Sequence, residues 1–385
     1  SKVFGIMEQQ SGAGSWTTWA GAPTPRPGQI ALWSIQSVAH GADYVSYFRW
    51  RTCTFGTEMY WHGILDYSGR DNERLAEINK VHEIFKKLHD VSGAVYQAEV
   101  AVLKDYDNVY DAEYDMTHRS VDRASGEALF KALQKSHTPF DYVYIDDAED
   151  VFKLAVYKVI FYPHPTIISA ARAKLLEEYV ADGGTLIIGC RSGYKDLTGK
   201  CTMEKLPGLL AKVTGADVHE YSFIAPDAGD VWINWNGRRI KASVFVDRVR
   251  AVPEEEKSLE ARKGSARVTA RYESDYYAGD GALVENRYGK GKCFYYGTAF
   301  TEEAVEAFLQ ESGVIDPYHE VIEVPEDCEI AVRKNERGTY LFVLNYGKEP
   351  VKYTLKKTME DLVNGTDVTG PQILEKYGFA VLKIK

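Results

Sequence analysis

A carboxylate ends a short apolar run at the start of this chain. The run Phe4-Gly5-Ile6-Met7 leads into Glu8, two glutamines and a glycine-rich loop, and Trp16 and Trp19 follow. In a (β/α)₈ barrel the catalytic groups lie where the strands end, at the carboxyl-terminal face. The pattern therefore favours a catalytic carboxylate between flat apolar walls, which suit the face of a sugar ring. On this stretch alone, however, an ordinary solvated Glu at a strand end is the more frequent case.

A second group of polar side chains lies on the loop of residues 51–70. Glu58 and His62 are four residues apart on this loop, and a loop this long inside a compact domain is usually functional or mobile. By chemistry alone, such a pair is more often a surface feature or a helical pair. Arg49 and Arg51 flank the preceding strand end, where they either orient the carboxylate by charge-assisted hydrogen bonds or form plain salt bridges.

The elements that position these groups follow from the local patterns. Gly41 supplies a helix stop, and the aromatic and β-branched residues of 43–50 favour a strand. A helix that repeats apolar residues at helical spacing presents a stripe to a core. We predict strands at residues 3–7 and 43–50 and helices at 27–39 and 72–89, an order that makes the last two βα units of a TIM barrel.

Five motifs in the first part of the chain carry a family resemblance. They are Met7-Glu8-Gln9-Gln10, Trp16, Pro25-Arg26-Pro27-Gly28, Ala39-His40-Gly41-Ala42 and Ser46-Tyr47-Phe48-Arg49-Trp50-Arg51. In this order they resemble the C-terminal part of a family 42 glycoside hydrolase, a β-galactosidase. The resemblance implies that Glu8 is the nucleophile of a retaining mechanism acting on terminal β-D-galactosides. It also implies that Trp16, Glu58 and His62 contact the galactose.

The acid/base partner of such a nucleophile is not expected in this chain. The family supplies it from an earlier barrel strand, and neither Glu58 nor Asp66 is a convincing substitute. Because the chain opens directly in a strand pattern without a start methionine, we expect its true N-terminus to be missing. The resemblance therefore predicts a chain that carries the nucleophile and is inactive alone.

The middle of the chain, residues 93–317, predicts a doubly wound flavodoxin- or amidotransferase-like domain. Strands that alternate with helices indicate a parallel sheet. We predict strands at 99–104, 141–145, 158–162 and 185–189, helices at 126–136, 169–181 and 301–312, and further strands within 206–281. Cys190 follows one of these strands, but without nucleophile-elbow spacing or recognisable partners we expect it to be inert. In the resembling family this domain forms a homotrimer.

The last part, residues 318–385, predicts a small antiparallel β-sandwich. The segments 340–346, 351–355 and 379–384 alternate apolar and polar residues, which is typical of strands with one buried face. Asn364-Gly365 is a hairpin signal. The predicted division is therefore a barrel part (1–92), a trimerisation domain (93–317) and a C-terminal β-domain (318–385).

Composition excludes several function classes. The net charge of −10 argues against nucleic acid, which requires clustered Lys and Arg. Five scattered cysteines without a CxxC pair favour a reducing, cytoplasmic location and no metal site. No glycine-rich dinucleotide motif follows the first strand of the middle domain, so we expect no cofactor. No apolar run approaches the ~20 residues of a membrane span.

The alternative to an enzyme is a non-catalytic oligomerisation or carbohydrate-binding module.

Overall fold

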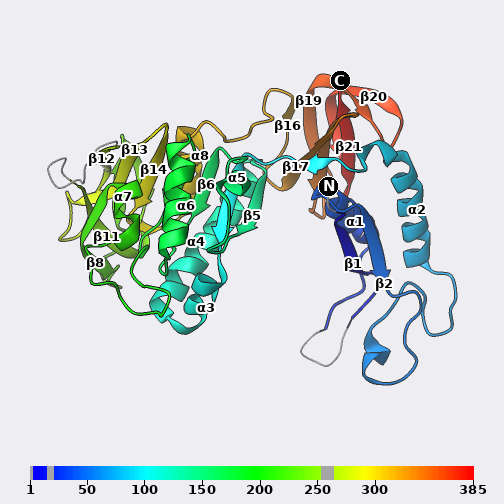
Figure 1. The fold of residues 1–385 in the computed structure, drawn as a ribbon. Coiled ribbons are helices and arrows are strands. Elements are labelled where there is room, and N and C mark those ends of the chain that lie inside the picture. Colours follow the sequence, from blue (N-terminus) through cyan, green and yellow to red (C-terminus); the bar gives the residue numbers. More distant parts are fainter. Residues whose placement is uncertain (1–2, 15–20, 253–263) are drawn as a thin grey trace. The chain divides into compact units, whose positions relative to one another are not determined.

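The computed structural model describes residues 3–14, 21–252 and 264–385. Its contacts divide the chain into two compact units (Figure 1). Unit 1 contains residues 1–97 together with 317–385, and unit 2 contains residues 98–316. The predicted first and last domains thus share one unit, while the boundaries near residues 93 and 317 stay a prediction.

The beginning of unit 1 has two parallel strands, each followed by a helix. Strand β1 (Gly5–Gln10) pairs with β2 (Tyr44–Phe48) in parallel, and the helices are α1 (Gln29–Ala39) and α2 (Glu73–Lys87), with short 3₁₀ turns η1 (Thr57–Tyr60) and η2 (His89–Val91). Helix α2 begins at Asn72, whose side chain accepts a hydrogen bond from the Leu75 amide at 3.1 Å. This is an ordinary N-cap. The elements lie within a few residues of the predicted ones.

The rest of unit 1 is an antiparallel sheet of seven strands. They are β3 (Val95–Tyr96), β16 (Ile322–Glu323), β17 (Cys328–Asn335), β18 (Gly338–Asn345), β19 (Val351–Asp361), β20 (Thr366–Leu374) and β21 (Phe379–Ile384). Strand β19 shifts register between Leu355 and Met359, so that it pairs with β16 before the shift and with β21 after it. Such an irregularity bends a strand. All seven strands are connected by hydrogen bonds into one sheet, and the predicted sandwich stays a prediction.

Unit 2 is built on a mixed sheet of twelve strands. Its parallel part runs β14-β7-β6-β4-β5 and continues at β14 into antiparallel β13, β12, β9 and β10. The parallel strands are β4 (Val100–Lys104), β5 (Phe140–Tyr144), β6 (Val159–Tyr162), β7 (Thr185–Ile188) and β14 (Gly291–Tyr296). The others are β8 (Ala216–Phe223), β9 (Trp232–Trp235), β10 (Arg238–Lys241), β11 (Ser243–Ala251), β12 (Gly264–Tyr272), β13 (Gly281–Tyr288) and β15 (Thr298–Ala299).

Helices cover both faces of this sheet. One apolar cluster joins the sheet to α4 (Met116–Lys135) and α8 (Glu302–Glu311), and a second joins the other face to α6 (Ala170–Ala181) and α7 (Ala211–Thr214). The smaller elements are α3 (Tyr106–Tyr114), α5 (Val151–Leu154) and η3 (Gly208–Leu210). The predicted helix at 126–136 is longer than expected, because the Asp115 side chain caps its start at Met116. Mixed α/β content with parallel strands agrees with the prediction for this region.

Candidate functional site

Glu8 lies in a bulge near the carboxyl end of β1. Ile6 pairs with Val45 and Gln9 pairs with Tyr47, so Met7 and Glu8 together face a single residue of β2. A bulge re-aims the side chains that it contains, and bulges are common next to active sites. The Glu8 side chain is exposed, and no described residue forms a hydrogen bond or ion pair with its carboxylate. Glu8 is therefore accessible to a ligand from solvent.

The segment after β1 is tied to the end of β2. The Ser11 hydroxyl donates to the Phe48 carbonyl at 2.8 Å, and the His62 amide donates to the Ala13 carbonyl at 2.7 Å. Gly12 permits this approach, since a Cβ there would lie 2.6 Å from the His62 carbonyl oxygen. The ends of β1 and β2 and the loop that carries His62 thus meet at one edge.

Arg49 forms its ion pair with Glu58 and not with Glu8. An Arg49 Nη1–Glu58 Oε2 ion pair of 2.9 Å joins the residue after β2 to the 3₁₀ turn η1. The Arg49 guanidinium also lies 4.9 Å from the centre of the Phe48 ring. Of the two roles considered for Arg49, the structure shows the salt bridge. That pair fixes where the Glu58 carboxylate lies, at 44% side-chain exposure.

His62 is supported by an aromatic neighbour that the sequence did not single out. Its Nε2 lies 3.3 Å from the Tyr67 hydroxyl, and the two rings meet edge to face at 5.4 Å. Trp61, the preceding residue, packs edge to face on Phe48 at 6.4 Å. Trp16 and Trp19 lie outside the described residues, so the predicted wall at Trp16 stays a prediction. No local pattern marks Tyr67 as a partner of His62 beyond its place on the same loop.

Asp66 is a turn residue. Its carboxylate accepts hydrogen bonds from the Ser68 hydroxyl at 2.7 Å and the Ser68 amide at 2.9 Å. These bonds, led by that of the Ser68 side chain, lower the pKa of Asp66. A general acid needs a pKa that is raised toward neutrality. The surroundings of Asp66 therefore argue against its use as a substitute acid.

Cys190 lies at a second strand end, in unit 2, and is closed off from solvent. It is 0% exposed, and burial raises the pKa of its thiol well above the usual range. His164 Nδ1 is 3.9 Å from the thiol but 2.7 Å from the Cys190 carbonyl, and its Nε2 is 2.7 Å from the Ser125 hydroxyl. Both ring nitrogens are thus engaged. These contacts support the expectation that Cys190 is inert.

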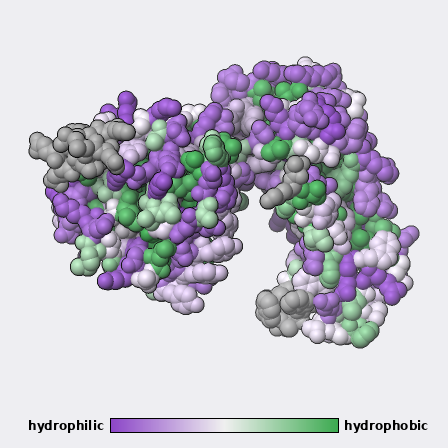
Figure 2. All heavy atoms as spheres, viewed as in Figure 1, coloured by the Kyte–Doolittle hydropathy of each residue, from purple (hydrophilic) through white to green (hydrophobic). Residues whose placement is uncertain are grey.

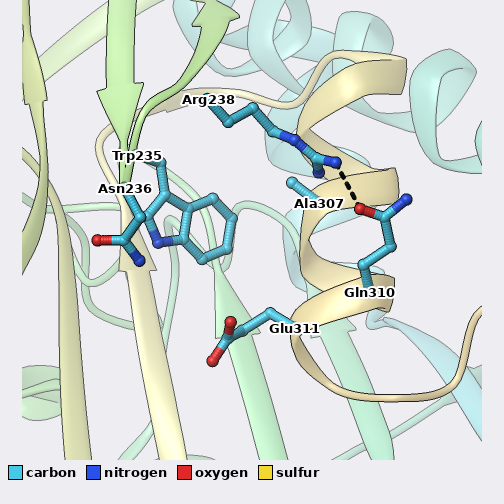
Figure 3. A pocket seen from close by; sticks show the side chains of 6 residues that line it. All are labelled: Trp235, Asn236, Arg238, Ala307, Gln310 and Glu311. Atoms are coloured by element: carbon cyan, nitrogen blue, oxygen red, sulfur yellow. Dashed lines mark hydrogen bonds between the residues drawn. The ribbon is translucent and has the colours of Figure 1, made fainter.

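A hollow beside Trp235 in unit 2 lacks the open aromatic face of a sugar-binding platform. It has a volume of about 320 Å³ and is lined by Trp235, Asn236, Arg238, Ala307, Gln310 and Glu311 (Figure 3). The Trp235 indole is only 7% exposed because it packs on Phe308 at 4.7 Å. Arg238 donates across the hollow to Gln310. No open ring face is left for a sugar there.

Metal ligands, membrane spans and disulfides are the remaining features that bear on a site in the described part of the chain. No His, Cys, Asp and Glu side chains there gather in a group that could hold a metal ion. None of the helices in those residues is long and apolar enough to cross a bilayer. All five cysteines are free thiols.

Three family descriptions match consecutive parts of the chain. "Beta-galactosidase" matches residues 1–88, "Beta-galactosidase trimerisation domain" matches 98–314 and "Beta-galactosidase C-terminal domain" matches 327–383. The chain is 29% identical to β-galactosidase BgaA of Clostridium cellulovorans over 100% of this chain and 56% of that protein. It is 27% identical to β-galactosidase Pbg of Clostridium perfringens over 100% of this chain and 55% of that protein. The chain spans about half the length of the curated relatives that it matches.

Solved structures share the fold. A β-galactosidase from Bacillus circulans sp. alkalophilus superposes with a TM-score of 0.85 at 25% identity, covering 100% of this chain and 56% of that one. Gan42B, described as a GH42 β-galactosidase, superposes with a TM-score of 0.86 at 24% identity, covering 100% of this chain and 54% of that one. The fold of this chain therefore recurs within larger chains.

Proposed function

The chain belongs to glycoside hydrolase family 42, the β-galactosidases, and we propose that it is the part of a retaining β-galactosidase that carries the nucleophile, Glu8. One observation supports this most directly. Glu8 is an exposed carboxylate in a bulge near the end of β1. The end of β2 and the loop that carries His62 lie at the same edge. That placement suits a group that must reach a substrate from a strand end.

In the proposed reaction the Glu8 carboxylate attacks the anomeric carbon of a terminal β-D-galactoside. The bond to the aglycone oxygen breaks as a general acid protonates that oxygen, and a galactosyl ester of Glu8 forms. Water then attacks the ester, the same acid group now acting as base, and galactose leaves with retained configuration. Glu58 and His62 bind sugar hydroxyls, and Trp16 covers one face of the ring.

The acid/base residue is proposed to come from the part of the polypeptide that precedes this chain. In a retaining enzyme it must lie about 5–5.5 Å from the nucleophile. We propose that the 385-residue chain alone turns over galactosides poorly, because losing general acid assistance typically costs about 10²–10⁴-fold. The test is an assay of the chain itself with a nitrophenyl β-galactoside. Turnover like that of an intact β-galactosidase, abolished by Glu8→Gln in the same chain, would contradict this proposal.

Azide rescue tests the role of Glu8. In the full-length polypeptide, Glu8→Gly removes the nucleophile and leaves space for a small anion. Added azide then attacks the anomeric carbon from the side that Glu8 occupied, so the expected product is the α-galactosyl azide. Asp66→Gly is the matched control, and azide should not change its product. A β-configured azide, or no loss of turnover in Glu8→Gly, would overturn the assignment.

We also propose that the protein assembles as a homotrimer through unit 2, which matches a trimerisation domain. Three exposed tyrosines form a stacked row there. Tyr106 lies 5.9 Å from Tyr110 and 5.1 Å from Tyr144, ring centre to ring centre, and the three are 61%, 56% and 47% exposed. Figure 2 shows pale, weakly hydrophilic residues over α3, where two of them lie. Aromatic side chains of this kind are enriched at protein interfaces.

The trimer is tested by analytical ultracentrifugation. The double variant Tyr106→Ser/Tyr110→Ser should dissociate at protein concentrations where the parent is trimeric. Met203→Ser removes a side chain that is 91% exposed elsewhere in unit 2 and should leave the trimer unchanged. A monodisperse monomer of the unaltered protein at micromolar concentration would refute the assembly.

A further inference from the structure

A buried arginine in the C-terminal sheet reaches into the beginning of the chain. Arg333 on β17 is 2% exposed. Its Nη1 donates to the Val38 carbonyl at 2.8 Å and its Nη2 to the Ala94 carbonyl at 2.6 Å, with longer contacts to the Ala42 and Gly41 carbonyls at 3.3 and 3.5 Å. Carbonyls at the end of a helix lack partners within the helix and carry partial negative charge. Arg333 therefore caps the C-terminus of α1 from another part of the sequence.

The same arginine is coupled to the start of both strands of the site. Arg333 Nη2 lies 3.7 Å from Asp43 Oδ1, directly before β2. Asp43 in turn holds Phe4, directly before β1, by two hydrogen bonds. The Phe4 amide donates to Asp43 Oδ2 at 3.1 Å, and the Asp43 amide donates to the Phe4 carbonyl at 2.7 Å. Arg333, Asp43 and Phe4 thus connect β17 to the amino ends of β1 and β2.

A second polar contact and an apolar layer surround this connection. His40 Nε2 lies 2.5 Å from Glu329 Oε1, and the Tyr346 hydroxyl donates to the other Glu329 oxygen at 2.5 Å. Glu329 has 5% side-chain exposure. The apolar layer comprises Leu32, Ile35 and Ala39 of α1, Ile84 of α2, and Ala331, Tyr340, Phe342, Leu344 and Val381 of the sheet. One face of the C-terminal sheet is therefore covered by α1 and α2.

We propose that the C-terminal sheet acts as a clamp on β1 and β2, and that Arg333 is a positioning residue for the strand that carries Glu8. A sheet that served as a separate module would expose this face to solvent or to a ligand. Instead the charged side chain of Arg333 is aimed at backbone carbonyls of the α1–β2 connection. The clamp rests on the proposed function in one respect: the proposed function identifies Glu8 as the group that the clamp positions.

Amide hydrogen exchange of the 385-residue chain tests the clamp without any activity. Arg333→Met keeps the apolar stem and removes the donors. It should speed exchange in Gly5–Gln10 and Tyr44–Phe48 by at least about tenfold relative to β19 and β20. Arg333→Lys keeps the charge and one donor group, and should restore part of the protection.

Leu355→Ala is the matched control. Leu355 is 2% exposed in the apolar cluster on the other face of the sheet, away from α1, so its loss should speed exchange in β19 and β20 more than in β1 and β2. Equal patterns in the two variants would overturn the proposal. So would fast exchange of β1 and β2 in the unaltered chain, because the clamp would then not hold them.

A kinetic readout separates positioning from general stability. In the full-length polypeptide, Arg333→Met should lower kcat about tenfold on a nitrophenyl β-galactoside with KM changed less than about twofold, and Arg333→Lys should recover part of kcat. If the parent lacks β-galactosidase activity, the proposed function fails while the exchange experiment still decides the clamp. Normal kcat in Arg333→Met would contradict the positioning role.

Discussion

Two pairs of parallel strands in this molecule end in side chains of a catalytic type, and they differ in access. At β1 and β2 of unit 1, Glu8 is exposed and Glu58 is partly exposed beside Arg49. At β6 and β7 of unit 2, His164 and Cys190 are 3% and 0% exposed, and Asp247 next to them is 0% exposed. Glu8 and Cys190 both lie at or near the carboxyl end of a parallel strand, yet only Glu8 is open to solvent.

The electrostatics of the two strand ends differ in the same way. In unit 2, burial raises the pKa of Cys190, and burial also lowers the pKa of His164 to about 4 despite the opposing bond to the Cys190 carbonyl. A neutral thiol beside a neutral imidazole is not an activated nucleophile. Position at a strand end is therefore insufficient evidence for a site, and exposure together with hydrogen-bond partners distinguishes the two regions.

The largest expected effect is on the exposed strand end. Glu8→Gln in the full-length polypeptide should lower turnover of a nitrophenyl β-galactoside on the order of 10⁴-fold or more, as loss of a nucleophile does in other enzymes. Folding should be unchanged, because the side chain is exposed. Steady-state kinetics with circular dichroism measure both quantities. Near-normal turnover would show that the exposed end of β1 is no more catalytic than the buried strand ends of unit 2.

The next effect is on the stability of the buried region at the ends of β6 and β7 in unit 2. Asp247 accepts hydrogen bonds from the Arg191 amide at 2.9 Å and from the Tyr194 and Tyr295 hydroxyls at 2.9 and 2.7 Å. Asp247→Ala leaves these donors buried without an acceptor and should lower the free energy of unfolding by about 3–5 kcal/mol. Urea unfolding measures it. Exposed Asp227→Ala is the control, expected within about 0.5 kcal/mol, and equal losses in both would contradict this reading.

A third effect is the pH dependence of unit 2. Because the folded state lowers the pKa of His164 from 6.5 to about 4, the unfolded state binds more protons between these values, and stability falls as pH falls through this window. By pH 4.5 the loss attributable to His164 should be roughly 2–3 kcal/mol. Urea unfolding at pH 7 and 4.5, compared with His164→Gln, isolates it. An identical pH slope in the variant would show that His164 is not the source.

The smallest effect is expected at Cys190. Cys190→Ala removes a buried thiol and its weak 3.9 Å contact with His164 Nδ1, which keeps its shorter bond to the residue 190 carbonyl, so the free energy of unfolding should change by about 1 kcal/mol. Turnover of the full-length polypeptide should stay within about twofold. A large loss of activity with normal stability would mean that the closed strand end takes part in chemistry.

Much of the local structure could be predicted from the sequence, because helix stops, caps and alternation are local signals. The strand that ends near Glu8 and the helices α1 and α2 are examples. The role of β17 could not be predicted in this way. Arg333 lies in an alternating strand of the tail, where a charged residue normally faces solvent, but its partners Val38 and Ala94 are more than 200 residues away in the chain.

In the candidate site, too, some features could be predicted from the sequence and others depend on contacts that only the structure shows. Glu8 stood out by its place after an apolar run, whereas Glu58 and His62 were expected in the site only because of the family resemblance. The structure brings the loop of His62 to the segment after β1 through the Ala13 carbonyl. The pairing of Arg49 with Glu58 was not predictable, because from the sequence Glu8 was an equally suitable partner for this arginine. The bulge at Met7 and Glu8 was not predictable either, since it depends on the register with β2.

Covalent trapping tests the central claim most directly. The full-length polypeptide is incubated with 2,4-dinitrophenyl 2-deoxy-2-fluoro-β-D-galactoside, whose fluorine slows hydrolysis of the galactosyl ester more than its formation, and the product is digested and sequenced by mass spectrometry. If the exposed end of β1 is the nucleophilic half of a β-galactosidase site, one fluorogalactosyl group is expected on Glu8, with none on Glu58, Asp66 or Cys190. Labelling of a different carboxylate while Glu8 stays unmodified would contradict the account.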